Sequence, residues 1–388
     1  MSNYEVHGIG FPNKGAELLL SYAVMRMEML LPGSRFICQP NGIDSATKIL
    51  SSGGLLKLFT ELKGIDVRWL TSRVPTRIRN WYGLAVEGDS LGVVDASGFA
   101  YGDFWGVDKV RRAARRAVSY RRRGGFYVLL PQSFGPFSDH AVAKEARRLI
   151  RASNLVFARD EASLAHLEKL NTGREIQLCC DITVDADVSI EGLGWKPLDL
   201  GPGRQALVIP NEKLLTHGGG GRDRVDYIRF LAASVTLLQQ AGFSVGLLNH
   251  EGDGDNALCV DVLSALPTRI PYVHDLEAAQ IKQQIGSAHF VLSSRYHGAV
   301  SALSQGVPCA ILGWSHKYQG LAQDFEMVDW CLEGPLDDCL EQVASLLPHA
   351  ATATSRLRAV SERLQADVAG CWAQVAAVVA QTSRRMTT

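Results

Sequence analysis

The chain has 388 residues, of which 46% are apolar and 21% charged, and its 40 basic and 40 acidic side chains give a formal charge of zero. This length exceeds one ordinary hydrophobic core, so two domains of a globular protein are expected. The neutral balance gives no reason to expect a nucleic-acid partner, and no segment is apolar over the length of a membrane span. The first residues also lack the basic start and apolar run of a signal peptide, so a cytoplasmic location is expected.

Segments with strand-like and helical periodicity alternate through the first half of the chain, and this pattern is typical of parallel strands joined by crossover helices. The expected strands are residues 4–9, 35–38, 91–95, 126–130, 155–158 and 176–180, and the expected helices are residues 15–30, 107–121, 139–152 and 161–170. Glycine and proline then crowd residues 186–204, which suits an interdomain linker.

The alternation restarts after this linker and ends in a long amphipathic helix. We therefore expect an N-terminal Rossmann-like domain at residues 1–190, a linker at 191–204 and a C-terminal Rossmann-like domain at 205–388 that includes the terminal helix. The expected fold class is α/β, with two mainly parallel sheets facing a central cleft, and it resembles the GT-B glycosyltransferase architecture. Ligands of such folds bind beyond the carboxyl ends of the strands.

The most informative segment for chemistry runs from Phe290 to Val300, where an apolar strand ends in a polar turn and a helix of small residues begins at once. Backbone N–H groups at a helix start favour an anion. Arg295 can grip a carboxylate or phosphate with two parallel hydrogen bonds, and His297 can exchange a proton near neutral pH. Ser294 and Gly298 complete this expected anion site. The alternative is a histidine that only caps or packs in the turn.

A second strand ends in charge at Arg159-Asp-Glu, just before another helix. Arg159 is expected to point from the strand end into the cleft, and Asp160 to cap the helix near Ser163. The alternative is a purely structural arginine–aspartate pair. Lys317, at a later helix start, is a candidate phosphate contact, although a solvated lysine is the more common situation.

Several polar residues after the other strands are candidates for contacts with an acceptor or with the cleft. They are also explained by ordinary loop formation, because glycine-rich turns join strands to helices without any ligand. The loop at residues 250–255 has an acidic DxD spacing that binds metal in some sugar-nucleotide enzymes, but a plain loop is favoured there. No CxxC pair occurs, and no metal site is expected. The acceptor or cleft candidates are Asn13, Glu17, Ser97, Asp103, Gln132, Ser133 and His250.

The helix from Val107 to Arg123 carries an apolar stripe on one side and many basic residues on the rest of its circumference. A solvated face is the default interpretation of such a helix. The sharper hypothesis is contact with anionic lipid or with a lipid diphosphate, which would place the protein peripherally at the inner face of the membrane.

Taken together, these segments resemble the polysaccharide pyruvyltransferase family. The matching elements occur in the family's order along most of the chain, although none is decisive alone. They are Asn13 to Glu17, Ser97-Gly98, Gln132 to Pro136, Ala158 to Ser163, Cys180-Asp181, His250 followed by Asp255, Arg295-Tyr-His297, and Gly306 to Pro308 leading to Lys317.

The resemblance implies a two-lobed transferase that moves a pyruvyl group from phosphoenolpyruvate to two hydroxyls of a sugar in a bacterial polysaccharide or its precursor. A pyruvate ketal forms, phosphate is released, and no cofactor is needed. The resemblance places the donor-site arginine and histidine at Arg159 and His297, with Arg295 in the same element. It also implies an acceptor side in the N-terminal domain and a donor side in the C-terminal one. The acceptor is expected to be a sugar, including a lipid-linked oligosaccharide as one form.

Two other functions remain open from the sequence. One is a nucleotide-sugar glycosyltransferase of the same architecture, whose donor would bring a base and a ribose. The other is a non-catalytic sugar-binding relative. The cationic set of Arg159, Arg295 and His297 argues against the second, because binding a neutral sugar needs no such cluster.

Overall fold

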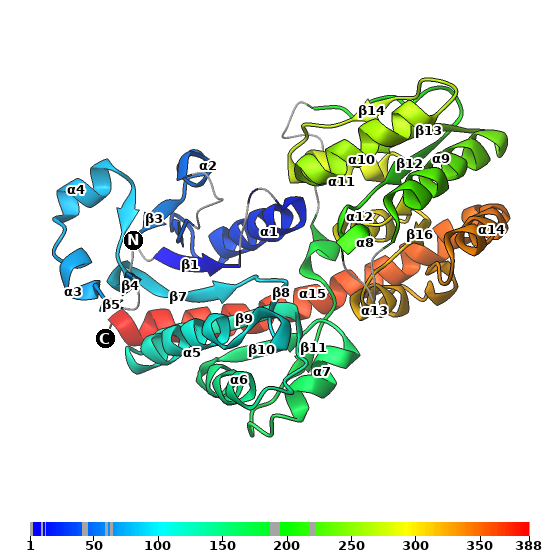
Figure 1. Cartoon of the computed structure of the whole chain (residues 1–388). Coiled ribbons are helices and arrows are strands. Elements are labelled where there is room, and N and C mark those ends of the chain that lie inside the picture. Colours follow the sequence, from blue (N-terminus) through cyan, green and yellow to red (C-terminus); the bar gives the residue numbers. More distant parts are fainter. Residues whose placement is uncertain are drawn as a thin grey trace. The chain divides into compact units, whose positions relative to one another are not determined.

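The computed structural model describes residues 3–8, 11, 13–40, 46–58, 61–62, 65–186, 195–216 and 222–387 (Figure 1). The chain forms two compact units, one made of Met1–Pro12, Ala16–Ile182 and Val368–Thr388, and the other of Asn13–Gly15 and Thr183–Asp367. This division differs from the predicted one at the terminal helix, α15 (Ala350–Thr387), whose last part belongs to the first unit. Of the predicted linker, residues 191–194 lie outside the described part, and residues 195–203 form neither helix nor strand.

The first unit is built on a parallel sheet with the strand order β11-β10-β9-β7-β1-β2-β3-β6, and β8 pairs with β9. A separate antiparallel pair is formed by β4 (Glu61–Leu62) and β5 (Ile65–Asp66). The strands of the main sheet are β1 (Asn3–His7), β2 (Phe36–Cys38), β3 (Leu55–Lys57), β6 (Leu84–Ala85), β7 (Ser90–Asp95), β8 (Phe99–Tyr101), β9 (Phe126–Phe134), β10 (Leu155–Ala158) and β11 (Gln177–Leu178).

The helices of this unit cover both faces of the sheet. The connections from β1 to β2 and from β7 to β9 run in opposite directions across the sheet, so right-handed crossovers place α1 and α5 on opposite faces. Figure 1 shows α5, α6 and α7 on one side of the sheet, where alanine and valine residues of α5 and α6 pack on Val93 and Leu129. The helices are α1 (Lys14–Leu30), α2 (Ala46–Ser51), α3 (Arg68–Thr71), α4 (Thr76–Trp81), α5 (Val107–Arg122), α6 (His140–Ala152) and α7 (Glu161–Glu168), with η1 (Glu87–Asp89) and η2 (Asp103–Trp105).

The second unit has a five-stranded parallel sheet with the order β14-β13-β12-β15-β16. The predicted α/β class with mainly parallel sheets is confirmed in both units. The strands are β12 (Arg204–Ile209), β13 (Phe243–Leu248), β14 (Tyr272–Val273), β15 (Phe290–Ser293) and β16 (Cys309–Ile311). The helices are α8 (Lys213–Thr216), α9 (Arg224–Gln240), α10 (Gly252–Ala265), α11 (Ala278–Gly286), α12 (Tyr296–Leu303), α13 (His316–Asp324), α14 (Leu336–Leu346) and the first part of α15, with η3 (Ile182–Asp185), η5 (Val328–Trp330) and η6 (Leu347–His349).

Each sheet has one point at which the direction of chain progress reverses. In the first sheet it lies between β1 and β7, where His7 is paired with Asp95, and in the second between β12 and β15, where Ile209 is paired with Ser293. Open parallel sheets bind ligands outside the carboxyl ends of their strands at such reversal points. A ligand-binding site is therefore expected among the residues that follow these strands.

Candidate functional site

The turn between β15 and α12 lies at the reversal point of the second sheet. Ser294 and Arg295 form the turn, and His297 and Gly298 lie in the first turn of the helix, as the sequence predicts. The hydroxyl of Ser293 closes this turn, because its Oγ accepts from the Arg295 N–H (3.1 Å) and donates to the Arg295 carbonyl (2.9 Å). The helix start is therefore held in one geometry, and the first-turn N–H groups of such a helix favour an anion.

The guanidinium of Arg295 is buried against two acidic side chains. Its Nε and Nη2 donate to the two carboxylate oxygens of Asp255 at 2.7 and 2.6 Å, and its Nη1 pairs with Glu251. Burial lowers the pKa of Arg295, but the two carboxylates outweigh it and raise the pKa above its usual range. Arg295 therefore stays charged and joins the start of α10 to the start of α12. Its predicted contact with a donor stays a prediction, because the guanidinium N–H groups are bonded to these two carboxylates in the structure.

Ser294, a predicted donor contact, is buried in a polar network instead of facing outward. Its hydroxyl accepts from Tyr227 (2.8 Å), and its carbonyl accepts from Asn211 Nδ2 (2.8 Å) and from the Tyr318 hydroxyl (3.0 Å). These bonds tie β15 to the segments that follow β12 and β16. Ser294 thus supports the shape of the turn, and the sequence did not single out Asn211, Tyr227 or Tyr318 for this task.

The ring of His297 packs against the backbone of Gly15, one of three early residues that belong to the second unit. A methyl group at Gly15 would lie 1.9 Å from His297 Nδ1, so no side chain fits there. The same early segment brings Asn13, whose Nδ2 donates to Glu251 Oε1 at 3.2 Å. The predicted cleft residue Asn13 thus joins the acidic pair around Arg295.

His250 follows β13 and is buried beside this network. Burial lowers its pKa well below the usual value, and the positive charge of Arg295 and the neighbouring His297 and Lys14 add to the effect. The ring is therefore neutral at neutral pH. The sequence interpretation of residues 250–255 as a plain loop is wrong in part, because α10 begins at Gly252 and carries Asp255 inward.

Lys317 lies half-buried near the start of α13, among three aromatic rings. Its Nζ is 5.1 Å from the ring centre of Trp314, 5.2 Å from that of Tyr296 and 5.4 Å from that of Tyr318. Aromatic faces attract a cation and stabilise its position. The side chain is thus held close to the start of α12, and its predicted phosphate contact stays a prediction.

A pocket of about 560 Å³ opens next to His250, at the carboxyl ends of β13 and β14. Its wall is rich in carboxylates and amides and contains few cations. Such groups suit the hydroxyls of a sugar or ribose better than a phosphate. The polar lining residues are Lys14, Asn249, His250, Glu251, Asp253, Asn256, Tyr272, His274, Asp275 and Glu277.

In the first unit, Arg159 follows β10 and is buried. Its Nη1 donates to Asp181 (2.9 Å) and its Nη2 to the hydroxyl of Ser133 (2.8 Å), which in turn donates to Asp160 (2.9 Å). Asp160 accepts from the Ser163 N–H at 2.7 Å and caps α7, so that part of the sequence prediction is confirmed. Asp181 and Ser133 therefore fix the arginine at the carboxyl edge of the sheet, and its predicted contact with a donor stays a prediction.

The other predicted acceptor contacts of this unit make internal bonds. The Ser97 hydroxyl donates to Asp95 Oδ1 at 2.5 Å, and Asp103 accepts from the backbone N–H groups of Ser138 and Asp139 at 2.7 and 3.2 Å. Glu17 and Gln132 are buried in the unit's interior, as is Ser133. These bonds give Ser97, Asp103 and Ser133 structural tasks, and the predicted contact of all five residues with a sugar stays a prediction.

A charged cluster at the reversal point of the first sheet was not predicted. Glu5 pairs with Lys57 at 2.6 Å and with His7 at 3.0 Å, and Arg116 contacts the His7 ring at 2.9 Å. Asp95, paired with His7 in register, accepts from the hydroxyls of Tyr101 and Tyr127. The sequence does contain a signal for this cluster, because a charged or titratable residue stands inside or at the end of an apolar strand at Glu5, His7 and Asp95.

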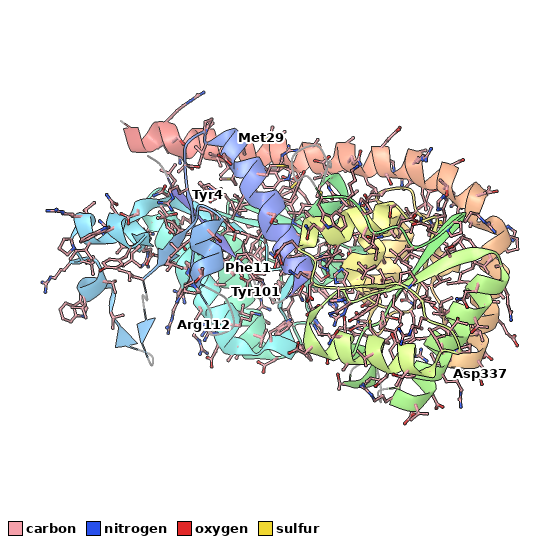
Figure 2. The ribbon with its side chains drawn as sticks, turned by 90° about the horizontal axis from the view of Figure 1, so that it is seen from above. Tyr4, Phe11, Met29, Tyr101, Arg112 and Asp337 are labelled. Carbon is pink, nitrogen blue, oxygen red and sulfur yellow. The ribbon has the colours of Figure 1, made fainter. Side chains whose placement is uncertain are left out.

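The position of Arg116 also corrects the predicted basic face of α5. Its side chain turns inward to His7 and donates to Gln39 at 3.0 Å, so it does not belong to the outer face. Arg123 pairs with Glu87, and Arg111 pairs with Asp108 and Glu145. Arg112 remains exposed, and Figure 2 shows it at the margin of the unit. The outward charge of α5 is therefore smaller than its sequence suggests.

The described residues contain no group of three histidine, cysteine or acidic side chains arranged to hold a metal ion. None of the helices described here is both long and apolar enough to cross a membrane.

Comparisons with known proteins agree with this architecture. The sequence model of a family described as polysaccharide pyruvyl transferase matches residues 30–316. No curated protein matches the chain. Among solved structures, UDP-GlcNAc 2-epimerase from Neisseria meningitidis bound to UDP-GlcNAc is similar, with 13% identity, a TM-score of 0.55 and coverage of 95% of this chain and 100% of that one.

Two further structures share the fold. A putative UDP-N-acetylglucosamine 2-epimerase from Listeria monocytogenes has 13% identity and a TM-score of 0.54, covering 92% of this chain and 91% of its own. The N-terminal domain of Candida albicans trehalose-6-phosphate phosphatase has 9% identity and a TM-score of 0.52, with 98% coverage of both chains. At such identities the similarity shows the fold alone, and it confirms the predicted GT-B-like class.

Proposed function

The chain belongs to the polysaccharide pyruvyl transferase family, and from this premise we propose that it uses phosphoenolpyruvate to form a pyruvate ketal on a sugar. The observation that carries the proposal is the family match over residues 30–316, which includes Arg159, Arg295 and His297. The acceptor is a sugar of a bacterial polysaccharide or of its precursor, and no cofactor takes part.

The reaction needs one proton and two hydroxyls. The methylene carbon of phosphoenolpyruvate gains a proton, and a sugar hydroxyl attacks the neighbouring carbon as positive charge develops there. The bond between that carbon and the phosphate oxygen then breaks, phosphate leaves, and a second hydroxyl closes the ketal. Each hydroxyl gives up its proton, so that one proton balances the methylene carbon and the other the departing phosphate. A positioned histidine that moves one of these protons typically contributes about 10² to 10⁴ in rate.

The residues around α12 suit the donor half of this chemistry. His297 supplies the titratable group, the helix start favours the phosphate or carboxylate, and Lys317 supplies a held cation. In the first unit, Arg159 is the cation that the family resemblance assigns to the donor. Arg295 acts as a positioning residue in this scheme, since it bonds Asp255 and Glu251.

A sugar carried on a lipid diphosphate is one form of acceptor that would bring the protein to the inner face of the membrane. The outward residues of α5, among them Arg112, are the predicted contact for such a ligand. With Arg116 turned inward, a test of this contact changes Arg112 and Arg115 alone.

The test of the proposed reaction is incubation with phosphoenolpyruvate and a panel of defined glycosides, read by mass spectrometry and by phosphate release. We expect acceptor-dependent phosphate release and a product heavier than the acceptor by one pyruvyl ketal. Turnover of a nucleotide-sugar, with phosphoenolpyruvate inert across the panel, would instead favour a glycosyltransferase. The carboxylate-rich pocket beside His250 would then be the place for the ribose hydroxyls.

A further inference from the structure

The segment between β5 and β6 exposes an unusual set of large apolar side chains. Trp69 is 61% exposed, Trp81 81% and Tyr82 63%, and Leu70 and Ile78 are also exposed. None of the α4 residues is buried, so this helix forms without contributing to the core. Large apolar side chains gathered on a protein surface mark contact with a partner or a membrane.

The same segment is rich in arginine and lacks acidic residues. Residues 67–83 contain four arginines and no aspartate or glutamate. Arg79 is bound to Asp89, but Arg73 and Arg77 are exposed, and the Arg73 guanidinium lies 5.3 Å from the ring centre of Trp69. Cations alternate with indole and phenol rings, and such rings prefer the boundary between headgroups and hydrocarbon.

The place of the segment in the fold leaves it accessible. It precedes β6, the outermost strand of the first sheet, and enters that strand from its amino end. Figure 1 shows α3 and α4 at the end of the sheet beyond β3. Leu50, also exposed, lies over Gly83 and extends the apolar area. His7 and Asp95 lie at the opposite, carboxyl ends of β1 and β7, so a surface lying on α3 and α4 does not cover them.

We propose that this surface binds the anionic face of a phospholipid bilayer, with Trp69, Trp81 and Tyr82 at the headgroup boundary and Arg73 and Arg77 on the lipid phosphates. We call it the aromatic–arginine surface. We assign a lipid as the partner because the exposed arginines and the anionic headgroups have opposite charges. Anionic lipid attracts each arginine near its surface by about 1 kcal/mol, as it does the basic residues of polybasic segments. The proposal does not depend on the reaction proposed above. The surface consists of Leu50, Trp69, Leu70, Arg73, Arg77, Ile78, Trp81 and Tyr82.

The test is co-sedimentation of the full chain with vesicles of phosphatidylcholine alone or of phosphatidylcholine mixed with phosphatidylglycerol. We expect binding to the mixed vesicles that weakens with added salt. Joint Arg73→Ser and Arg77→Ser changes should lower partitioning roughly 30-fold, at about 1 kcal/mol for each charge. Joint Trp69→Ser and Trp81→Ser changes should abolish most of the remaining binding. Met29→Ser, an exposed apolar residue of α1 labelled in Figure 2, is the matched control and should leave binding unchanged.

Three outcomes would overturn the proposal. The first is equal sedimentation of wild type and both double variants. The second is loss of binding only when Arg112 and Arg115 of α5 are changed. The third is a concentration-dependent dimer that the tryptophan changes dissolve, which would make a second copy the occupant. Quenching of tryptophan fluorescence by brominated lipid gives an independent reading, and it should fall in the single Trp69→Ser and Trp81→Ser variants.

Discussion

Arg295 and Asp255 form a buried, two-pronged ion pair, with both carboxylate oxygens of the aspartate within 2.7 Å of guanidinium nitrogens. The pair joins the first turn of α10 to the turn that precedes α12. It therefore couples α10, which begins two residues after His250, to α12, which carries His297.

Removing Asp255 should be strongly destabilising, because the buried Arg295 then keeps only one of its two carboxylate partners, Glu251. We expect Asp255→Ala to lower the free energy of unfolding by roughly 3–5 kcal/mol in urea denaturation. Asp253→Ala changes an exposed acidic residue two positions before Asp255. It is the matched control and should change the free energy of unfolding little. Similar stability of the two variants would contradict a structural role for the pair.

His297 should act in proton transfer while Arg159 holds the donor. Arginine keeps its proton in the working range, whereas histidine exchanges one. We expect His297→Ala to lower kcat by about 10² to 10⁴ with little change in calorimetric donor affinity. Arg159→Lys should mainly weaken donor binding, since lysine lacks the two-pronged grip.

The contact between Arg159 and Asp181 provides the control for that second effect. If Asp181→Asn weakens donor binding as much as Arg159→Lys does, then the arginine acts through its structural pair and not through the donor. If His297→Ala loses donor binding but keeps turnover at saturation, His297 is an anion contact and the proton comes from another group.

A side chain at Gly15 should disturb His297, because a methyl group there would lie 1.9 Å from the imidazole nitrogen. We expect Gly15→Ala to lower kcat by up to about 10²-fold, as the ring must move by an ångström or more. Gly370→Ala, in α15 and with open space around its Cα, is the control and should keep wild-type rates. Unchanged turnover of the Gly15 variant would mean that the ring position is not critical.

Stability should fall when the pH drops below about 6.5, the usual histidine value. The pKa values of His250 and His7 both lie below it, mainly because of burial and then because of Arg295 and Arg116 respectively. Between the usual and the folded values, the unfolded chain binds protons that the folded chain does not, so stability rises with pH there and is lost as pH falls. Each histidine contributes a slope of up to about 1.4 kcal/mol per pH unit.

The measurement is the free energy of unfolding between about pH 7 and pH 5.5, a range that avoids ordinary carboxylate titration. His250→Gln should flatten the slope whatever it does to absolute stability. His140→Gln, a change at an exposed histidine of α6, is the control for replacing a histidine elsewhere in the chain. An identical slope in all three chains would show that His250 is protonated in the folded state as readily as in the unfolded one.

Periodicity in the sequence was enough to predict the α/β class, the parallel sheets and most strand positions, because local alternation and helical spacing record which faces are buried. The cap at Asp160 and the strand–turn–helix unit from Phe290 to Gly298 were likewise local and were predicted correctly. The family resemblance also rested on the order of short motifs along the chain, and the family match confirms it.

Partners distant in sequence were decided only by the tertiary structure. The local sequence around Arg295 predicts a side chain that faces a ligand. In the folded chain, however, Asp255, 40 positions away in sequence, binds its guanidinium group. Arg116 reads as part of a basic face, but the sheet places His7 and Gln39 beneath it. A buried charge requires a partner, and the topology of the fold decides which distant residue lies close enough to be that partner, which the local sequence pattern does not encode.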